Sequence, residues 1–175
     1  MAMLSIKLLG APLLLLDGRP LSVPRRKSRA LLFYLAARTT PATRDHLLAL
    51  LWPDHDRPAA QQILRTSLHG LRKALGPALI VGDDTLSLAP DADVDVWRFE
   101  AGLAATADLE TLAAALALYR YDFLADFSVP DAEAFEAWAD IERERYRQLA
   151  THGFAGDADQ DPSGTRSSAR TAEPF

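Results

Sequence analysis

The sequence predicts a mainly α-helical protein with small β elements. Apolar residues recur at helical spacing through much of residues 30–75 and 95–150. Short apolar runs between turn residues, which are typical of strands, occupy residues 4–24 and 78–88. With 175 residues and 49% hydrophobic content, the chain can bury the core of one ordinary domain or of two small ones.

Charge divides the chain near Pro90, although the overall net charge is only −5. Residues 1–90 hold 12 Lys and Arg against six Asp and Glu, a net charge of +6. Residues 91–175 hold seven against 18, a net charge of −11. This asymmetry favours an anionic partner for the first half, and we expect two small domains, residues 1–90 and 91–152. Residues 153–175 are rich in Gly, Ser, Asp, Thr and Pro, which predicts a disordered tail.

The first elements are predicted to form a small antiparallel sheet. Its expected strands are residues 4–9, 13–16 and 21–23, and Asp17-Gly18 is a hairpin signal. A cluster of cations follows at the entry to the next helix, with Ser28 as a candidate cap. The cluster consists of Arg25, Arg26, Lys27 and Arg29. Cations at a helix N-terminus oppose the helix dipole, which favours contact with phosphates over the alternative of a solvated basic turn.

Three helices and a hairpin are predicted next. The first helix covers residues 30–37, and the second is capped by Thr43 and ends before Pro53. The third runs from Pro58 to Leu75 and is stopped by Gly76-Pro77. The runs 78–81 and 85–88 flank Gly82-Asp83-Asp84 as a hairpin. Three helices followed by such a hairpin are the layout of a winged helix.

The third helix has one apolar side and one polar side. The expected core side comprises Ala60, Ile63, Leu64, Ser67, Leu68, Leu71, Ala74 and Leu75. The expected outward side comprises Gln62, Arg65, Thr66, His69, Arg72 and Lys73. The outward side contains no carboxylate, and its groups are those that bond phosphates and base edges. A DNA-reading face and an ordinary basic surface are both open on this helix alone.

The order of motifs resembles a known family of bacterial activators. RRKSRALLFYLA, RDHLLALLWPD and LRTSLHGLRKALG resemble the OmpR-type winged helix-turn-helix of regulators of the antibiotic-regulatory-protein (SARP) type. VDVWRFEAGL, ALALYRYDFLADF and AFEAWADIERERYRQL resemble the opening helices of the bacterial transcriptional activator domain, which is built of tetratricopeptide-like hairpins. The resemblance covers about residues 4–150. It implies an OmpR-type winged helix followed by a short tetratricopeptide-like all-α region.

The resemblance also implies a function. The helix ending at Leu75 would enter the major groove of double-stranded DNA, with its six outward residues as candidate contacts. Arg65 is the best candidate for a base contact because its guanidinium matches guanine, whereas Arg72 and Lys73 are expected on phosphates, as are Arg25, Arg26 and Lys27. The family binds direct repeats near promoters and recruits RNA polymerase. We therefore expect a sequence-specific transcriptional regulator, an activator, whose helical half contacts polymerase or forms a homodimer.

Two departures from the family pattern stand out. The hairpin tip offers Asp83 and Asp84 where related proteins offer basic residues or glycine, so a wing contact with DNA is in doubt. The helical half is also short, since about three repeat units are needed to bury a continuous core. A minimal regulator, a truncation and an altered reading frame would each explain this. The acidic tip also leaves open an alternative function, a protein-interaction adaptor with lost or weak DNA binding.

Other functional classes find little support. There is no cysteine, the histidines have no metal-ligand spacing, and no glycine-rich phosphate loop occurs. Asp54-His55-Asp56 is better explained as a polar loop than as a metal site. We therefore expect no enzyme activity, catalytic residue, cofactor or metal. Gly10 and Pro12 interrupt the apolar run near the N-terminus, which is also too short to span a bilayer, so a cytoplasmic protein is predicted.

Overall fold

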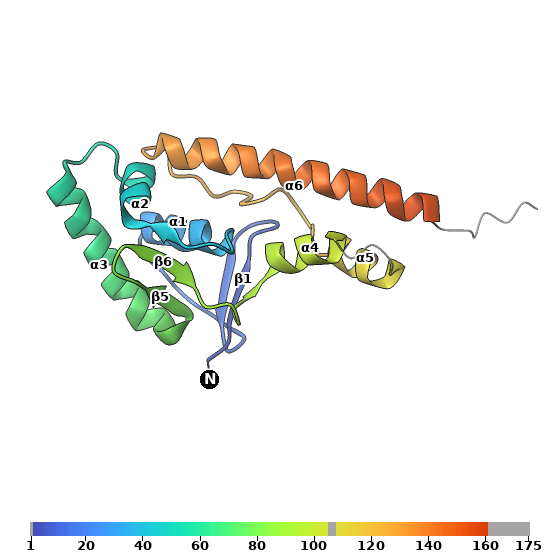
Figure 1. Ribbon diagram of the computed structural model, residues 1–175, viewed down its shortest axis with the longest axis horizontal. Coiled ribbons are helices and arrows are strands. Elements are labelled where there is room, and N and C mark those ends of the chain that lie inside the picture. The colour runs from blue at the N-terminus through green and yellow to red at the C-terminus, as the bar shows by residue number, and fades with distance from the viewer. Residues whose placement is uncertain (1, 105–107, 161–175) are drawn as a thin grey trace, which may run out of the picture.

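The structure is a computed structural model that describes residues 2–104 and 108–160. Two small sheets and three helices form the N-terminal half, and three further helices follow (Figure 1). The strands are β1 (Leu4–Lys7), β2 (Leu13–Leu16), β3 (Arg19–Pro20), β4 (Ala42–Thr43), β5 (Leu79–Val81), β6 (Thr85–Leu88) and β7 (Asp93–Val94). The helices are α1 (Arg26–Ala36), α2 (Arg44–Leu51), α3 (Arg57–Leu75), α4 (Asp95–Ala104), α5 (Leu109–Leu116) and α6 (Glu133–Gln160), with a 3-10 turn at Gly76–Ala78.

The first sheet has the strand order β3-β2-β1-β7. The predicted Asp17-Gly18 turn is confirmed, with φ angles of 52° and 75° that suit a tight hairpin. The third strand is shorter and earlier than residues 21–23, because Arg19–Pro20 already pairs with the end of β2. The fourth strand, β7, pairs in parallel with β1. The N-terminal sheet therefore extends past the division that we expected after residue 90.

The three helices of the winged helix lie close to their predicted positions. Thr43 caps α2 as expected, since its hydroxyl accepts a hydrogen bond from His46 N at 3.2 Å. Helix α1 starts earlier than expected, with Arg25 in the N-cap position and no side-chain cap. The assignment of Ser28 as its cap was wrong, because Ser28 is buried within the first turn. Asp56 caps α3 by accepting from Ala59 N at 3.3 Å.

A second sheet completes the winged helix. Its strand order is β4-β6-β5, and β5 and β6 form the predicted hairpin. Helix α3 ends at Gly76, whose φ of 56° favours glycine, and the chain then turns into β5. The hairpin lies beside α3 in Figure 1, and both are on the side of the molecule away from α5.

The helical half packs directly on the winged helix. Figure 1 shows α6 as one long helix that runs from α2 toward α4 and α5. The aromatic rings of Tyr34 in α1 and Trp138 in α6 are 4.7 Å apart, and Phe123 lies 5.7 Å from Trp138. The core of this half includes nine buried or partly buried residues. They are Phe99, Leu103, Leu112, Leu116, Tyr119, Phe123, Leu124, Phe135 and Trp138.

Helix α6 corrects the expected start of the tail. We predicted disorder from residue 153, but the helix continues to Gln160. Tertiary packing explains the difference, because a Cβ on Gly153 would lie 2.7 Å from Leu116 Cδ2, so the glycine permits a close approach between helices. The rest of the expected tail, residues 161–175, lies outside the described residues.

A buried carboxylate joins the first strand to the helical half. Asp95, at the start of α4, accepts hydrogen bonds from the backbone N–H groups of Leu8 and Leu9 at 2.9 to 3.0 Å. Burial raises the pKa of Asp95, and these backbone hydrogen bonds oppose part of that shift. A single apolar core runs through both halves. The helices are therefore fixed to the winged helix and are not a separately tethered unit.

Candidate nucleic-acid interface

Helix α3 presents the predicted polar side to solvent. Its inward side buries six residues, namely Ala60, Leu64, Ser67, Leu68, Leu71 and Leu75. Ile63 and Ala74 are partly buried, in keeping with the predicted core side. All six predicted outward residues are exposed, namely Gln62, Arg65, Thr66, His69, Arg72 and Lys73. The helix thus places two arginines, a lysine and an imidazole on one accessible surface, which we call the α3 face.

Hydrogen bonds organise the N-terminal part of the α3 face. Arg65 Nη1 donates to Gln62 Oε1 at 2.9 Å, and the Thr66 hydroxyl donates to the Gln62 backbone carbonyl at 3.0 Å. The Arg65 bond uses only one of the five guanidinium N–H donors. The remaining donors can form the paired hydrogen bonds that a guanine edge accepts. Gln62 therefore holds the side chain that is the best candidate for base contact.

A groove of about 500 Å³ separates α3 from the wing hairpin. Its polar lining is entirely cationic or imidazole: Arg44, Arg65, His69, Arg72 and Lys73. Among the residues that the structure describes, no carboxylate lines this groove. A groove lined by several cations and no acidic side chain concentrates positive potential. Such a potential suits the sugar-phosphate backbone of a nucleic acid.

Arg44 is a candidate that the sequence reasoning missed. It is the first residue of α2, and its Nη2 donates to the Gly82 carbonyl in the wing at 3.2 Å. The Arg44 backbone N–H also donates to the Asp84 carbonyl at 2.9 Å. A cation directly after a helix cap opposes the helix dipole, as in the cluster at residues 25–29, and this signal was present in the sequence.

The wing tip is acidic, as the sequence indicates. Asp83 and Asp84 are both exposed between β5 and β6. Neither side chain lines the groove that contains Arg44 and Arg65. The hairpin therefore combines a cationic flank with a tip that repels phosphates.

The three predicted phosphate contacts at the start of α1 lie in two different environments. Arg25 and Arg26 are exposed, and within residues 2–104 and 108–160 neither takes part in an ion pair. Lys27 is only 20% exposed, and its Nζ lies 2.9 Å from Asp131 Oδ2. This hydrogen bond lowers the pKa of Asp131. Lys27 thus connects α1 to the segment before α6, which makes it a weaker candidate for a phosphate contact than its two neighbours.

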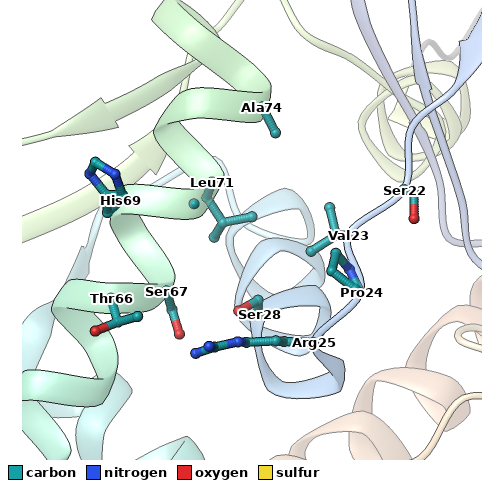
Figure 2. A pocket seen from close by; sticks show the side chains of 11 residues that line it. Ser22, Val23, Pro24, Arg25, Ser28, Thr66, Ser67, His69, Leu71 and Ala74 are labelled. Carbon is teal, nitrogen blue, oxygen red and sulfur yellow. The ribbon is translucent and has the colours of Figure 1, made fainter.

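Arg25 lies beside the α3 face. Figure 2 shows its side chain reaching from the start of α1 toward α3, near Thr66 and Ser67. Arg25, Thr66 and His69 line one cavity between the two helices. The structure therefore brings Arg25 together with two of the predicted α3 contacts, although these residues are about 40 positions apart in the sequence.

Metal chemistry gains no support from the described part of the chain. No group of three or more His, Asp or Glu side chains there could hold a metal ion. The Asp54-His55-Asp56 stretch is an exposed turn, and Asp56 serves as the cap of α3. None of the described helices is both long enough and apolar enough to cross a membrane.

Comparison with known proteins identifies a solved structure with the same architecture. No protein-family model matches the chain, and no curated protein matches its sequence. The structure of Mycobacterium tuberculosis EmbR in complex with a low-affinity phosphopeptide matches with a TM-score of 0.69 and 27% sequence identity. EmbR is a SARP-family regulator with an OmpR-like winged helix and a helical domain. The chain has a SARP-like fold.

The match covers most of this chain but only part of EmbR. It includes 91% of the chain described here and 48% of the EmbR chain. The chain therefore spans about half the length of the protein that it resembles. Because the match includes 91% of this chain, it extends over both the winged helix and the helices that follow it, which agrees with the predicted fold class of a mainly α protein with small β elements.

Proposed function

We propose that this protein is a sequence-specific DNA-binding regulator of transcription, an activator that binds promoter direct repeats. The observation that carries the proposal is the α3 face, which is exposed, free of carboxylates and continuous with a cationic groove beside the wing. The SARP-like fold supports the same function, because in an OmpR-type winged helix the corresponding helix is expected to enter the major groove.

The α3 face suggests a division of roles among its residues. Arg65, held by Gln62, would donate to the O6 and N7 atoms of a guanine. Arg44, Arg72 and Lys73 line the groove toward the wing and would contact phosphates there. Arg25 and Arg26 would contact phosphates on the other side of α3. The phosphate contacts would fix the register of the helix, and Arg65 would supply most of the base discrimination.

The proposed role of the helical half is to link DNA binding to the activation of transcription. Helix α6 packs on α1 and α2, so its orientation relative to bound DNA is fixed by the aromatic contacts described above. Its exposed acidic and basic side chains would then face RNA polymerase or a second copy of the chain at a defined position on the promoter. A net charge of −11 in residues 91–175 would keep this half off the DNA.

A salt titration with a matched pair of variants tests DNA binding. Arg72→Gln with Lys73→Gln removes two proposed phosphate contacts, and Arg19→Gln removes an exposed cation from β3 as a control. For each variant, the affinity for a fluorescent duplex is measured by anisotropy over a range of salt concentrations. The slope of log affinity against log salt should fall by about 1.8 in the double variant, roughly 0.9 per phosphate contact, and stay unchanged in Arg19→Gln.

A second candidate function is a protein-interaction adaptor. The exposed carboxylates of Asp83 and Asp84 favour it, because they oppose insertion of the wing along the phosphate backbone. An adaptor would bind duplex DNA weakly or not at all, and its affinity would not depend on Arg72 and Lys73. The salt titration therefore separates the two functions.

A further inference from the structure

A cavity between α1 and α3 is not explained by DNA binding. Its volume is about 300 Å³, which is the lower end of the range for small-molecule sites. Val23, Pro24, Leu71 and Ala74 provide apolar walls, and Figure 2 shows them around one end of the space. The walls come from the β3–α1 connection and from α3, so the cavity is built from two separate parts of the chain.

The other end of the cavity is polar. Ser28 and Ser67 line it and are each only 5% exposed. Their hydroxyl groups can donate hydrogen bonds to a bound group. Figure 2 shows both hydroxyl groups near the Arg25 side chain, which also lines the cavity. A guanidinium with two hydroxyl groups beside it can bind a hydrogen-bond acceptor that carries negative charge.

Helix α1 adds to the positive potential at this end. It starts at Arg26 and has no side-chain cap and no acidic residue in its first turn. The N-cap side chain therefore accepts no hydrogen bond from the first backbone N–H groups, and the helix dipole favours negative charge at this position. The buried Ser28 belongs to the same turn. The Arg25 guanidinium and the N-terminus of α1 thus both favour an anion at this end of the cavity.

From these contacts we infer that the cavity binds a small organic acid, a carboxylate or phosphate monoester with an apolar body about as large as a phenyl or benzyl group. The acid group would lie against Arg25, Ser28 and Ser67, and the apolar body against Val23 and Leu71. A phosphate of duplex DNA fits these observations less well, because the two serines are almost fully buried and a phosphate alone would leave the apolar walls empty.

The same cavity borders the proposed DNA contacts. Arg25, Thr66 and His69 line it and also belong to the proposed interface. An acid that engages Arg25 would withdraw this cation from the phosphate backbone. Ligand binding and DNA binding would therefore be mutually antagonistic, which would make the cavity an effector site. This coupling rests on the proposed function, whereas binding of the acid does not.

Two acids test the cavity without DNA present. The full chain, labelled with ¹⁵N, is titrated at millimolar concentrations with phenylacetate and with phenyl phosphate. Phenylacetamide serves as the neutral control, and inorganic phosphate as the anion without an apolar body. We expect at least one acid to shift the amide resonances of Ser28 and Ser67 and to bind at least about tenfold more tightly than either control, a difference of about 1.4 kcal/mol.

Variants locate the binding and give the outcomes that would overturn the proposal. Arg25→Gln should lower the binding affinity for the acid about tenfold. Arg26 is an exposed neighbour that does not line the cavity, so Arg26→Gln should leave that affinity unchanged. Equal effects of the two variants, or no resonance shift with either acid, would overturn the site. Tighter binding of inorganic phosphate than of phenyl phosphate would instead identify a site for DNA phosphates. If the acid binds but does not change the Kd for duplex DNA, the proposed antagonism is wrong, whereas the assignment of the cavity as an acid-binding site still holds.

Discussion

At the scale of single residues, tertiary packing decides which charged groups meet, as in the pair of Lys27 with Asp131 and the hydrogen bond from Arg44 to the wing. Helical periodicity alone placed Gln62, Arg65 and Thr66 on the outer side, and the structure agrees. The pairing of Lys27 with Asp131 could not be predicted, because it joins residues about 100 positions apart through tertiary packing. The same reason hid the approach of Arg44 to the wing.

Arg65 should determine part of the DNA sequence preference. Arg65→Ala is expected to lower affinity for the preferred duplex by about 1 to 3 kcal/mol and to relax selection at one base position. Gln61→Ala, which removes an exposed side chain outside the predicted outward face, is the control. The measurement is a competition assay across single-base variants of the site. If Arg65→Ala left the base preference unchanged, Arg65 would not be one of the residues that contact bases.

Asp122 should contribute a stability that depends on pH. Its carboxylate accepts a hydrogen bond from Arg147 Nη2 at 2.9 Å, and this bond lowers the pKa of Asp122. A lowered pKa stabilises the folded state above the ordinary value near 4, and this stability disappears as the pH falls through the folded-state pKa. Because the pair is exposed, Asp122→Asn should cost at most about 1 kcal/mol at pH 7.

Urea denaturation at several pH values measures this effect. The difference in unfolding free energy between the wild type and Asp122→Asn should shrink progressively as the pH falls below about 4. A difference that stays constant across this range would show that the substitution acts through packing and not through charge.

At the scale of secondary structure, turn and cap signals predicted most helix boundaries, and packing decided the remainder. Thr43 and Gly76-Pro77 mark boundaries that local chemistry sets, and the sequence predicted both. The start of α1 and the C-terminal end of α6 were misplaced. At both ends the helix extends through residues whose local preferences favour turns, because Ser28 and Gly153 are packed against neighbouring elements.

Two glycines should respond to alanine in opposite ways. A Cβ on Gly102 would overlap with Ala115 Cβ, so Gly102→Ala forces α4 and α5 apart and should destabilise the protein by about 1 to 3 kcal/mol. A Cβ on Gly70 in α3 meets no atom within 4 Å, so Gly70→Ala should stabilise the protein by about 0.5 to 1 kcal/mol. Thermal unfolding of both variants gives the comparison. A gain in melting temperature for Gly102→Ala would contradict the close contact between these helices.

At the scale of the whole molecule, the sequence predicted the fold class and the order of the elements. It did not predict that the two halves pack together as one unit. The division near Pro90 follows the change in charge, whereas β7 and Asp95 join the two sides of that division. Parallel pairing of two-residue strands and a carboxylate bound to distant backbone N–H groups leave no local pattern in the sequence. The helical half therefore looked more separate than it is.

Asp95 should make the two halves unfold together. Asp95→Ala leaves the backbone N–H groups of Leu8 and Leu9 without their acceptor, which should cost about 2 to 6 kcal/mol, at 1 to 3 kcal/mol for each buried group. The wild type should show one urea transition by tryptophan fluorescence and by circular dichroism, because both halves share a core. Separate transitions in the wild type would show that the halves fold independently.

The claim that the α3 face reads DNA is tested most directly by selection from a pool of random duplexes. The purified chain is mixed with the pool at a low and a higher salt concentration, and the retained duplexes are sequenced. We expect an enriched motif, with a direct repeat if two copies bind side by side. With Arg65→Ala, we expect the motif to lose its preference for guanine at one position. Retention without any enriched motif, or no retention at either salt concentration, would contradict the claim.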